Sequence, residues 1–401
     1  MENRSEENLW KKNTPQNFWK LRAGLDDYVW QQAVKKSLFI LDDLDQGITA
    51  DNYLEKILGE GYLEDKRWRL SPLKTFYYQI KPLVPRKIKT VARKFLAGGE
   101  IKQKRVNWPV EDRYARFMWH VLKEALIEAQ LKTVDMLYFW PEGKQFAFVL
   151  THDVETDKGL NNIGKLIDIE QSLGFYSNIN IIPERYPVDP QIIQHLLQAG
   201  CEIGIHGLHH DGKLYKNFRG FSERMIKING YMQKYASAGF RSPLMHRNAY
   251  WLQLLKADYD MSFFDTDPYE AMPGGILSIW PFEMGNLIEL PYTLVQDFTL
   301  FNLLDQNTPD LWLKKIEFLR AYNGMALLNV HPDYMVGPDK LVLYETFLKE
   351  VKSMGGYWHA LPGEITGWWK TRSEIGMENL GKDKRFSIKK VTLTDEGISI
   401  Q

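Results

Sequence analysis

From about residue 107 onward, short apolar runs alternate with longer segments in which apolar residues recur every third or fourth position. The short runs are typical of buried strands and the longer segments of amphipathic helices. The expected strands are 146–151, 177–182, 202–206, a run that begins at 240, 260–264, 287–290, 326–330 and a last one near 359. The expected helices are 161–173, 190–199, 222–236, 251–257, 308–322 and 339–354. This alternation predicts an α/β fold with a parallel sheet and crossover helices, either closed as a barrel or open.

The pattern divides the chain into three parts. Residues 1–106 read as a helical N-terminal region, 107–375 as the main domain and 376–401 as a charged tail. The tail ends in two β-rich runs that predict a hairpin.

One segment of the N-terminal region is strongly basic. Within 85–97, apolar residues recur at helical spacing, the basic residues occupy the other face, and Gly98 follows. A helix that packs on the main domain with a solvated basic face explains this pattern. The alternative is an interfacial helix on anionic lipid, which would give peripheral membrane contact.

Composition narrows the function classes. The 401 residues include 51 Lys+Arg and 51 Asp+Glu, so the net charge of zero argues against a nucleic-acid partner held by bulk charge. With 44% hydrophobic residues the chain can bury a sizeable core. The single cysteine, Cys201, excludes an intramolecular disulfide. The N-terminus is acidic and has no apolar leader, and no apolar run reaches the length that spans a membrane. We therefore expect a cytoplasmic protein, either free or at the inner membrane face.

Candidate catalytic and metal-binding residues lie at the ends of two expected strands. Asp153 and Glu155 follow the first strand at a spacing that points them to the same side, and His206 and His210 follow the strand 202–206. Two imidazoles at this spacing and a carboxylate can bind Zn²⁺ with one position left open. Histidines that only hydrogen-bond a loop would be the structural alternative. Three of the nine histidines lie within five residues, which favours metal binding.

Five short motifs now occur in order at strand ends, and together they resemble those of the polysaccharide deacetylases, which are sugar N- and O-deacetylases. They are Thr151-His152-Asp153-Val154-Glu155, the run from His206 to His210, Phe240-Arg241-Ser242-Pro243, Asp265-Thr266-Asp267 and Leu328-Asn329-Val330-His331. The resemblance covers about residues 140–370. It implies a deformed (β/α)7 barrel, here with a mainly helical N-terminal extension.

The resemblance also implies a divalent metal, most often Zn²⁺, on Glu155, His206 and His210. Asp153 would be the general base that takes a proton from the attacking water. The metal would polarise the acetamide carbonyl and stabilise the oxyanion.

Three further roles follow from the same resemblance. His331 would protonate the leaving amine. Arg241 would pair with Asp153 and keep it ionised. Asp267 would orient His331, with Asp265 as the alternative.

The sequence departs from the family pattern at three places, one of which is Leu244, where an aromatic residue is usual. Val154 separates the base from Glu155, so His152 or Asp157 could replace Glu155 as the metal ligand. Gly207 stands where a hydroxyl residue is usual, which removes one orienting hydrogen bond.

The leading hypothesis is therefore a metal-dependent hydrolase of non-peptide carbon–nitrogen bonds that deacetylates an N-acetylated sugar. The expected substrate is a precursor of a surface polysaccharide, nucleotide-linked or lipid-linked. Two alternatives stay open. One is a hydrolase of another non-peptide C–N bond, and the other is a catalytically silent carbohydrate-binding relative.

Overall fold

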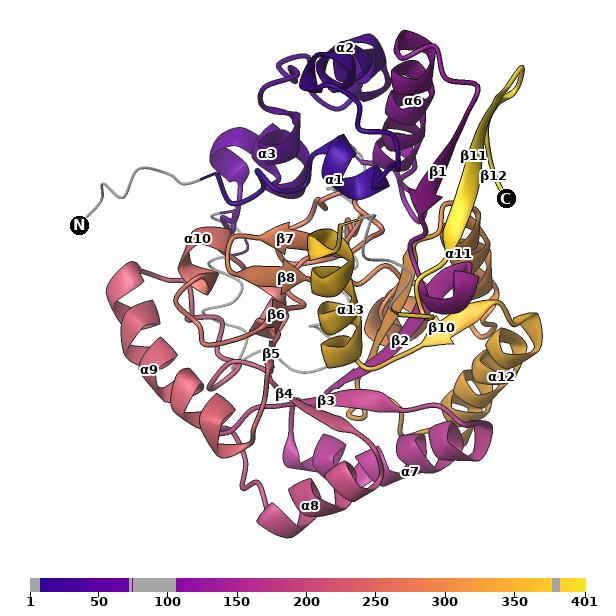
Figure 1. The fold of residues 1–401 in the computed structure, drawn as a ribbon. Helices are drawn as coiled ribbons and strands as arrows, with labels where there is room; N and C mark the ends of the chain where they lie inside the picture. The colour runs from indigo at the N-terminus through magenta and orange to yellow at the C-terminus, as the bar shows by residue number, and fades with distance from the viewer. Residues whose placement is uncertain (1–7, 72–73, 75–105, 377–382) are drawn as a thin grey trace.

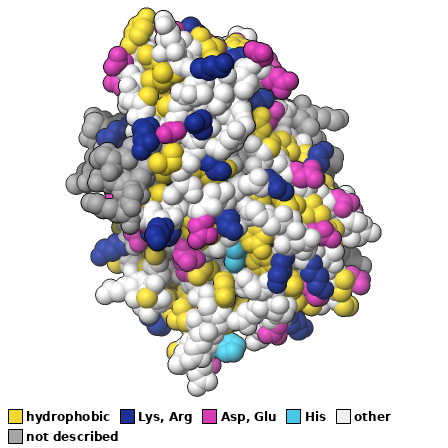
Figure 2. Space-filling model, turned by 45° about the vertical axis from the view of Figure 1, so that its right-hand side comes forward, with side chains coloured by type: hydrophobic (Ala, Val, Ile, Leu, Met, Phe, Trp, Pro, Cys, Tyr) yellow, Lys and Arg dark blue, Asp and Glu magenta, His cyan; other side chains and the backbone are white. Residues whose placement is uncertain are grey.

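The computed structural model describes residues 8–71, 74, 106–376 and 383–401. The basic amphipathic helix expected over 85–97 lies outside these residues. Among the helices that are described, none is both long and apolar enough to cross a bilayer. On the face seen in Figure 2, basic and acidic side chains are interspersed, in keeping with equal numbers of the two.

A curled parallel sheet forms the centre of the molecule (Figure 1). Its parallel strands are β2 (Phe146–Asp153), β3 (Ser177–Ile181), β4 (Glu202–Ile205), β5 (Gly239–Phe240), β6 (Tyr259–Asp260), β8 (Leu287–Glu289) and β9 (Met325–Val330). They pair in the order β9-β2-β3-β4-β5-β6-β8. The chain beyond β8 returns to β9, because Phe264 pairs with Tyr292 and the amide of Thr293 donates to the carbonyl of Leu327. The expectation of a deformed β/α barrel is confirmed.

The remaining strands extend this sheet or form a second one. In the main sheet, β7 (Phe282–Met284) runs antiparallel to β8, and β10 (Tyr357–His359) pairs with the start of β2. A separate antiparallel sheet has the order β1 (Thr133–Leu137), β11 (Ile388–Thr394), β12 (Gly397–Ile400). The hairpin expected at the end of the chain is therefore confirmed.

Helices follow most strands and cover the outside of the barrel (Figure 1). The helices are α1 (Pro15–Trp19), α2 (Asp27–Ser37), α3 (Tyr53–Leu58), α6 (Arg113–Glu128), α7 (Asp157–Leu173), α8 (Pro190–Gln198), α9 (Phe218–Lys234), α10 (Ala249–Leu252), α11 (Asp310–Ala321), α12 (Pro338–Met354) and α13 (Pro362–Glu374), with shorter turns at Leu38–Leu41, Gly61–Lys66, Pro141–Gly143, Pro243–Met245 and Thr299–Leu303.

Capping residues explain where the structure and the expected helix bounds differ. Thr156 accepts from the amide of Gly159, so α7 begins before the apolar pattern does. Asn248 accepts from the amides of Tyr250 and Trp251, which starts α10 earlier than the expected segment 251–257, and the helix already ends at Leu252. Apolar periodicity reports the buried face of a helix and misses a polar cap.

Helix α13 lies across the amino-terminal end of the barrel. The amide of Gly363 donates to the carboxylate of Glu202, the first residue of β4, at 2.9 Å. Near the other end of the helix, Lys370 lies 3.4 Å from Asp258, which directly precedes β6. The opposite end, where the strands finish, is therefore the one that carries the candidate chemistry.

The N-terminal region packs directly on the barrel. Phe18 contacts the ring of Trp280 with centroids 4.8 Å apart. The buried carboxylate of Glu60 accepts from Arg247 Nε at 2.7 Å and from the amide of Gly275 at 3.1 Å. Residues far apart in the sequence thus share one hydrophobic core and one buried ion pair.

Candidate active site

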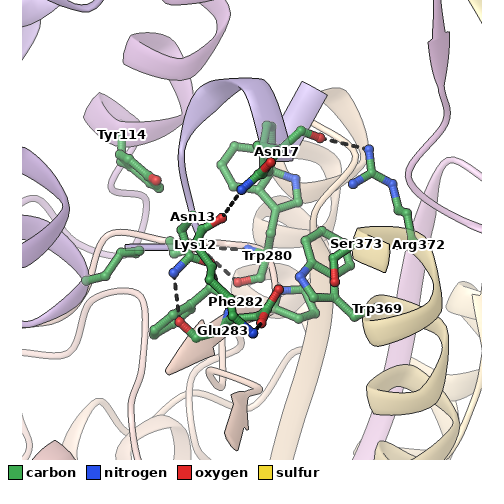
Figure 3. A pocket seen from close by; sticks show the side chains of 14 residues that line it. Lys12, Asn13, Asn17, Tyr114, Trp280, Phe282, Glu283, Trp369, Arg372 and Ser373 are labelled. Carbon is green, nitrogen blue, oxygen red and sulfur yellow. Dashed lines mark hydrogen bonds and ion pairs between the residues drawn. The ribbon is translucent and has the colours of Figure 1, made fainter. Parts of the chain in front are cut away.

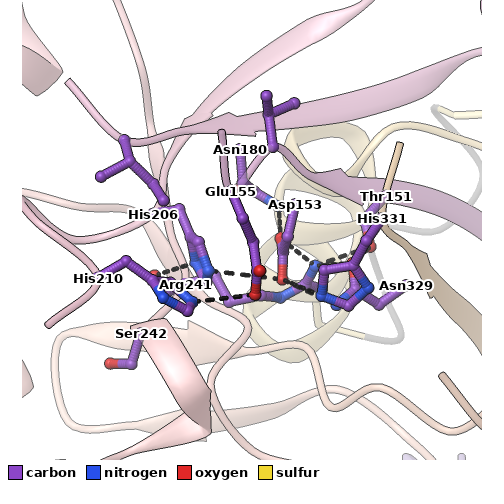
Figure 4. A network of polar contacts seen from close by, with 12 residues as sticks. Thr151, Asp153, Glu155, Asn180, His206, His210, Arg241, Ser242, Asn329 and His331 are labelled. Carbon is purple, nitrogen blue, oxygen red and sulfur yellow. Dashed lines mark hydrogen bonds and ion pairs between the residues drawn. The ribbon is translucent and has the colours of Figure 1, made fainter. Parts of the chain in front are cut away.

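The predicted catalytic side chains come together at the carboxyl ends of the strands. Asp153 is the last residue of β2, and His206, Arg241 and His331 directly follow β4, β5 and β9. Because these strands are parallel neighbours in one curled sheet, their ends face a common space. Figure 4 shows Asp153 and Glu155 between His206 and His210 on one side and His331 on the other.

Asp153 is buried and held by three donors. Arg241 Nη1 donates to Oδ1 at 3.0 Å, and the amides of Asn180 and Asn329 donate to Oδ1 at 2.9 Å and Oδ2 at 2.8 Å. Burial alone would raise the pKa of this carboxyl. The charges of Arg241, His206 and His331 and the hydrogen bond from Arg241 outweigh it and hold the pKa well below its ordinary range. Asp153 is therefore ionised at neutral pH.

Arg241 is fixed by the barrel wall. Its Nε donates to the carbonyl of Met261 at 3.0 Å, and Nη1 also reaches Thr151 Oγ1 and Asn329 Oδ1, both at 2.9 Å. The expected pairing of Arg241 with Asp153 is present. A guanidinium held from several sides keeps its charge at one place beside the carboxylate.

His331 is held by Asp297. Its Nδ1 lies 2.7 Å from Asp297 Oδ1, and its backbone amide donates to Oδ2 at 3.1 Å. Burial would lower the pKa of the imidazole, but Asp297 outweighs burial and raises it to about 10. His331 therefore carries a proton on both nitrogens at neutral pH, with Nε2 3.9 Å from Asp153 Oδ2.

The structure corrects the sequence-based prediction of the carboxylate that orients His331. That carboxylate is Asp297, and not Asp267 or Asp265. Asp267 instead accepts from the hydroxyl of Tyr292 at 2.9 Å, and Asp265 pairs with Lys315 at 2.7 Å. Neither has a hydrogen bond to His331 in the described part of the chain. Asp297 lies in the loop beyond the expected strand 287–290, so no strand end marked it in the sequence.

The three expected metal ligands lie beside this acid–base pair. His210 Nε2 is 3.1 Å from Glu155 Oε1, and the rings of His206 and His210 are 5.3 Å apart. His206 Nδ1 lies 3.0 Å from the carbonyl of Arg241, an arrangement that places the proton on Nδ1. Burial lowers the pKa of His206 to about 4, so its Nε2 offers a lone pair toward Asp153, 3.8 Å away.

Of the candidate third ligands, Glu155 is the one that lies beside His210. The two alternatives, His152 and Asp157, do not. His152 has both ring nitrogens engaged, with Nε2 2.7 Å from Glu170 and Nδ1 3.1 Å from the carbonyl of Val330. Asp157 is exposed at the start of α7. The second oxygen of Glu155 accepts from the hydroxyl of Tyr334 at 3.0 Å.

The donors suit a divalent ion in kind. A neutral imidazole, a second imidazole and a carboxylate are the ligands that Zn²⁺ prefers. As the side chains stand, however, no three His, Cys, Asp or Glu residues within the described residues surround one point closely enough to hold an ion. Glu155 pairs with His210 and Tyr334 instead, and the metal remains a proposal.

The structure explains why the usual hydroxyl residue is missing at Gly207. Its φ of +67° lies in the left-handed region, and a Cβ there would lie 2.4 Å from Pro243 Cγ. Only glycine fits between the two motifs at this point.

Sequence reasoning missed Asn180, Asn329, Asp297 and Tyr334. A signal existed for Asn180, since Asn178 and Asn180 alternate with isoleucines in β3 and are both buried. Polar residues on one face of a buried strand indicate a polar barrel interior. The role of Asn329 depends on the neighbouring strand and cannot be seen in one segment.

No protein-family model and no curated protein sequence matches the chain. Several solved structures with a similar arrangement are polysaccharide deacetylases. One from Mycobacterium smegmatis is 21% identical over 59% of this chain and 94% of that one, with a TM-score of 0.47. The peptidoglycan deacetylase PdaC from Bacillus subtilis is 14% identical over 58% and 94%, with a TM-score of 0.39. An allantoinase, Puue, is 14% identical over 58% and 92%, with a TM-score of 0.46. What the site can do is therefore inferred from its own side chains.

Proposed function

We propose that the chain is a metal-dependent hydrolase that removes the acetyl group from an N-acetylated sugar. One observation carries the proposal. The ionised carboxylate of Asp153 and the protonated imidazole of His331 face each other across 3.9 Å at the carboxyl end of the barrel, with His206 and the Glu155–His210 pair beside them. A base and an acid at one point are what hydrolysis of an amide requires.

Asp153 acts as the base. It accepts a proton from the water that attacks the acetyl carbonyl, while the water oxygen forms the new bond to carbon. Arg241, Asn180 and Asn329 hold the carboxylate in place by hydrogen bonds of 2.8–3.0 Å. They also disfavour its protonation before the substrate binds.

His331 acts as the acid. As the bond between the carbonyl carbon and nitrogen breaks, the Nε2 proton passes to the amine nitrogen, and the free amine and acetic acid, which keeps the second proton of the water until it ionises in solvent, result. Asp297 keeps Nδ1 protonated and fixes the ring, so Nε2 is the nitrogen that donates. Both protons of the reaction are thereby accounted for.

Glu155, His206 and His210 would hold the divalent ion, for which Zn²⁺ is the first choice. Such an ion, when bound, supplies Lewis-acid polarisation of the acetyl carbonyl. His206 is prepared for this role, since its Nδ1 proton is directed at the carbonyl of Arg241 and its Nε2 is unprotonated at neutral pH.

We further propose a precursor of a surface polysaccharide as substrate, carried on a nucleotide or a lipid. The basic segment 85–97 would bring the protein to a lipid-linked substrate at the inner membrane face. Sedimentation with anionic vesicles tests this point. Binding that is unchanged after the Lys and Arg residues of 85–97 become Gln would contradict it.

The direct test combines metal content with substrate screening. We would measure metal by elemental analysis in the wild type, in Glu155→Ala and His206→Ala, and in the control His209→Ala, whose ring pairs with Glu184 outside the cluster. About one zinc ion per chain is expected in the wild type and the control, and much less in the other two.

Acetate release from a panel of N-acetylated sugars is then assayed on the zinc-loaded protein. Release from at least one sugar is expected. Hydrolysis of cyclic or formyl amides without acetate release would favour the other C–N hydrolase. No turnover of either class by a metal-loaded protein would favour the silent carbohydrate-binding relative.

A further inference from the structure

A pocket whose lining includes no residue of the acid–base cluster lies beside α13 (Figure 3). The start of the chain, β7 and the end of α13 enclose it, and α13 covers the amino-terminal end of the strands. Asn17, Trp280, Glu283, Trp369 and Arg372 are among its lining residues. The hollow measures about 460 Å³ including its open mouth, and about 30 Å³ of it admits the centre of a water molecule. This is more than the roughly 10–15 Å³ that one water needs.

Two donors in the lining have unused hydrogens. Arg372 is 2% exposed, and its Nε and Nη2 donate to three backbone carbonyls, those of Tyr138, Leu137 and Phe18, at 2.8–3.0 Å. Its Nη1 makes no hydrogen bond within the residues that the structure describes. The same holds for Nε1 of Trp369, which is 5% exposed. Both residues line the hollow, so an acceptor inside it would complete the hydrogen bonding of these two donors.

The charges around Arg372 also favour an acceptor in the pocket. Among the described residues no carboxylate pairs with Arg372, and burial lowers the pKa of its guanidinium to about 9, so it stays charged at neutral pH. Burial and the nearby Arg372 both lower the pKa of Lys20. The carboxylate in the lining, Glu283, is bound by Lys12 at 2.6 Å. A buried cation without a counter-charge is costly, and an anion in the pocket would supply one.

We propose that this pocket binds a small anion, of the size of chloride or a single carboxylate group, between Arg372 Nη1 and Trp369 Nε1. A guanidinium and an indole N–H can both donate to one acceptor, and neither can accept. The rings of Trp280 and Trp369 form walls that limit its size. The site is separate from the acid–base cluster and does not depend on the proposed hydrolase activity.

The test uses the full chain and three proteins. Trp369→Phe removes one donor and keeps an aromatic ring in the wall. Trp358→Phe is the matched control, because Trp358 lies in β10 against Trp140 and Trp368 and not in the pocket lining. Crystals of each protein are soaked in sodium bromide and examined for anomalous scattering. In solution, thermal unfolding is followed while sodium chloride or sodium acetate is added to a low-salt buffer.

We expect a bromide peak in contact with Arg372 and Trp369 in the wild type and in Trp358→Phe. We also expect a saturable rise in melting temperature in both proteins, with an apparent affinity about tenfold weaker in Trp369→Phe. A response to chloride alone would identify a halide site, and a response to acetate as well would identify a carboxylate site. An empty pocket in the wild type after the soak, or equal responses of all three proteins, would overturn the proposal.

Discussion

At the scale of single residues, the charge of Asp153 depends on hydrogen bonds that pass across the barrel. Asn180 comes from β3, Arg241 follows β5 and Asn329 comes from β9, and each donates to the same carboxylate. Hydrogen bonds to a charged group contribute about 1.5–3 kcal/mol each. The carboxylate is thus kept ionised in a buried position.

Replacing Asn329 by Leu is expected to weaken both catalysis and stability. The change removes one donor to Asp153 and one acceptor for Arg241. We expect acetate release to fall about 10- to 100-fold and the free energy of unfolding to fall by about 1–3 kcal/mol. The acid limb of kcat/KM should move to higher pH, since the charged carboxylate loses support. A loss of stability with unchanged activity and pH profile would remove Asn329 from the positioning role.

Asp297 and Asp267 can be told apart by the pH dependence of activity. His331 must be protonated to act as the acid, and its pKa is raised to about 10, mainly by Asp297. In Asp297→Asn the imidazole should lose its proton at lower pH, so the basic limb of kcat/KM moves down toward the ordinary histidine range near 6.5. Asp267→Asn is the matched control and should leave this limb in place. A shift in the control and none in Asp297→Asn would restore the sequence-based assignment.

At the scale of elements, the sequence predicted the parallel strands of the barrel and the helices between them, because buried strands are apolar and long helices are amphipathic, but it missed β1, β7, α6 and α13. The motif residues that end or follow β2, β4, β5 and β9 were therefore placed correctly, whereas Asp265 and Asp267 lie beyond β6, which ends at Asp260. Asp297 was not predicted, because the chain beyond β8 has no such pattern and meets β9 through hydrogen bonds of Thr293 and Leu294 to Leu327 rather than as a strand. The two asparagine donors to Asp153, Asn180 and Asn329, were missed for a related reason. Their hydrogen bonds to this carboxylate depend on which strands are neighbours in the sheet.

Element packing also depends on Glu60, which precedes the turn at Gly61–Lys66. It forms a buried ion pair with Arg247 and accepts from Trp68 Nε1 at 2.9 Å. Glu60→Gln leaves the guanidinium of Arg247 buried without a full counter-charge. We expect a loss of about 3–5 kcal/mol in the free energy of unfolding by urea. The control Glu64→Gln, on an exposed residue, should change it by less than about 0.5 kcal/mol. Equal effects of the two changes would contradict this role.

At the scale of the whole molecule, several buried carboxyls make stability depend on pH. Burial raises the pKa of Asp265 to about 6, although Lys315 partly opposes it, and burial and Glu270 raise that of Asp267 to about 7. The folded chain then holds these protons more tightly than the unfolded chain, whose carboxyls titrate near 3.8. The stabilisation is complete below about pH 4 and is lost as pH rises toward 7.

We expect the contribution of Asp265 and Asp267 to the free energy of unfolding to be smaller at pH 7 than at pH 5, whereas the lowered pKa of His206 acts in the opposite direction between about pH 4 and 6.5. Asp153 does not offset this trend, because its depressed pKa contributes stability that is already present above the unfolded value. Asp267→Asn should flatten the dependence, with a gain at pH 7 relative to pH 5 of about 1–3 kcal/mol over the wild type. Urea unfolding at the two pH values measures it. An unchanged slope in the variant would show that Asp267 is already ionised in the folded chain.

Turnover by Asp153→Asn shows whether Asp153 is the base of a deacetylase. Acetate release from the best N-acetylated sugar would be measured for the zinc-loaded wild type and variant, with the metal content of each protein determined in parallel. If Asp153 is the base, kcat should fall about 10²–10⁴-fold in the variant while the metal is retained. Turnover within about threefold of the wild type, with the same metal content, would contradict this role.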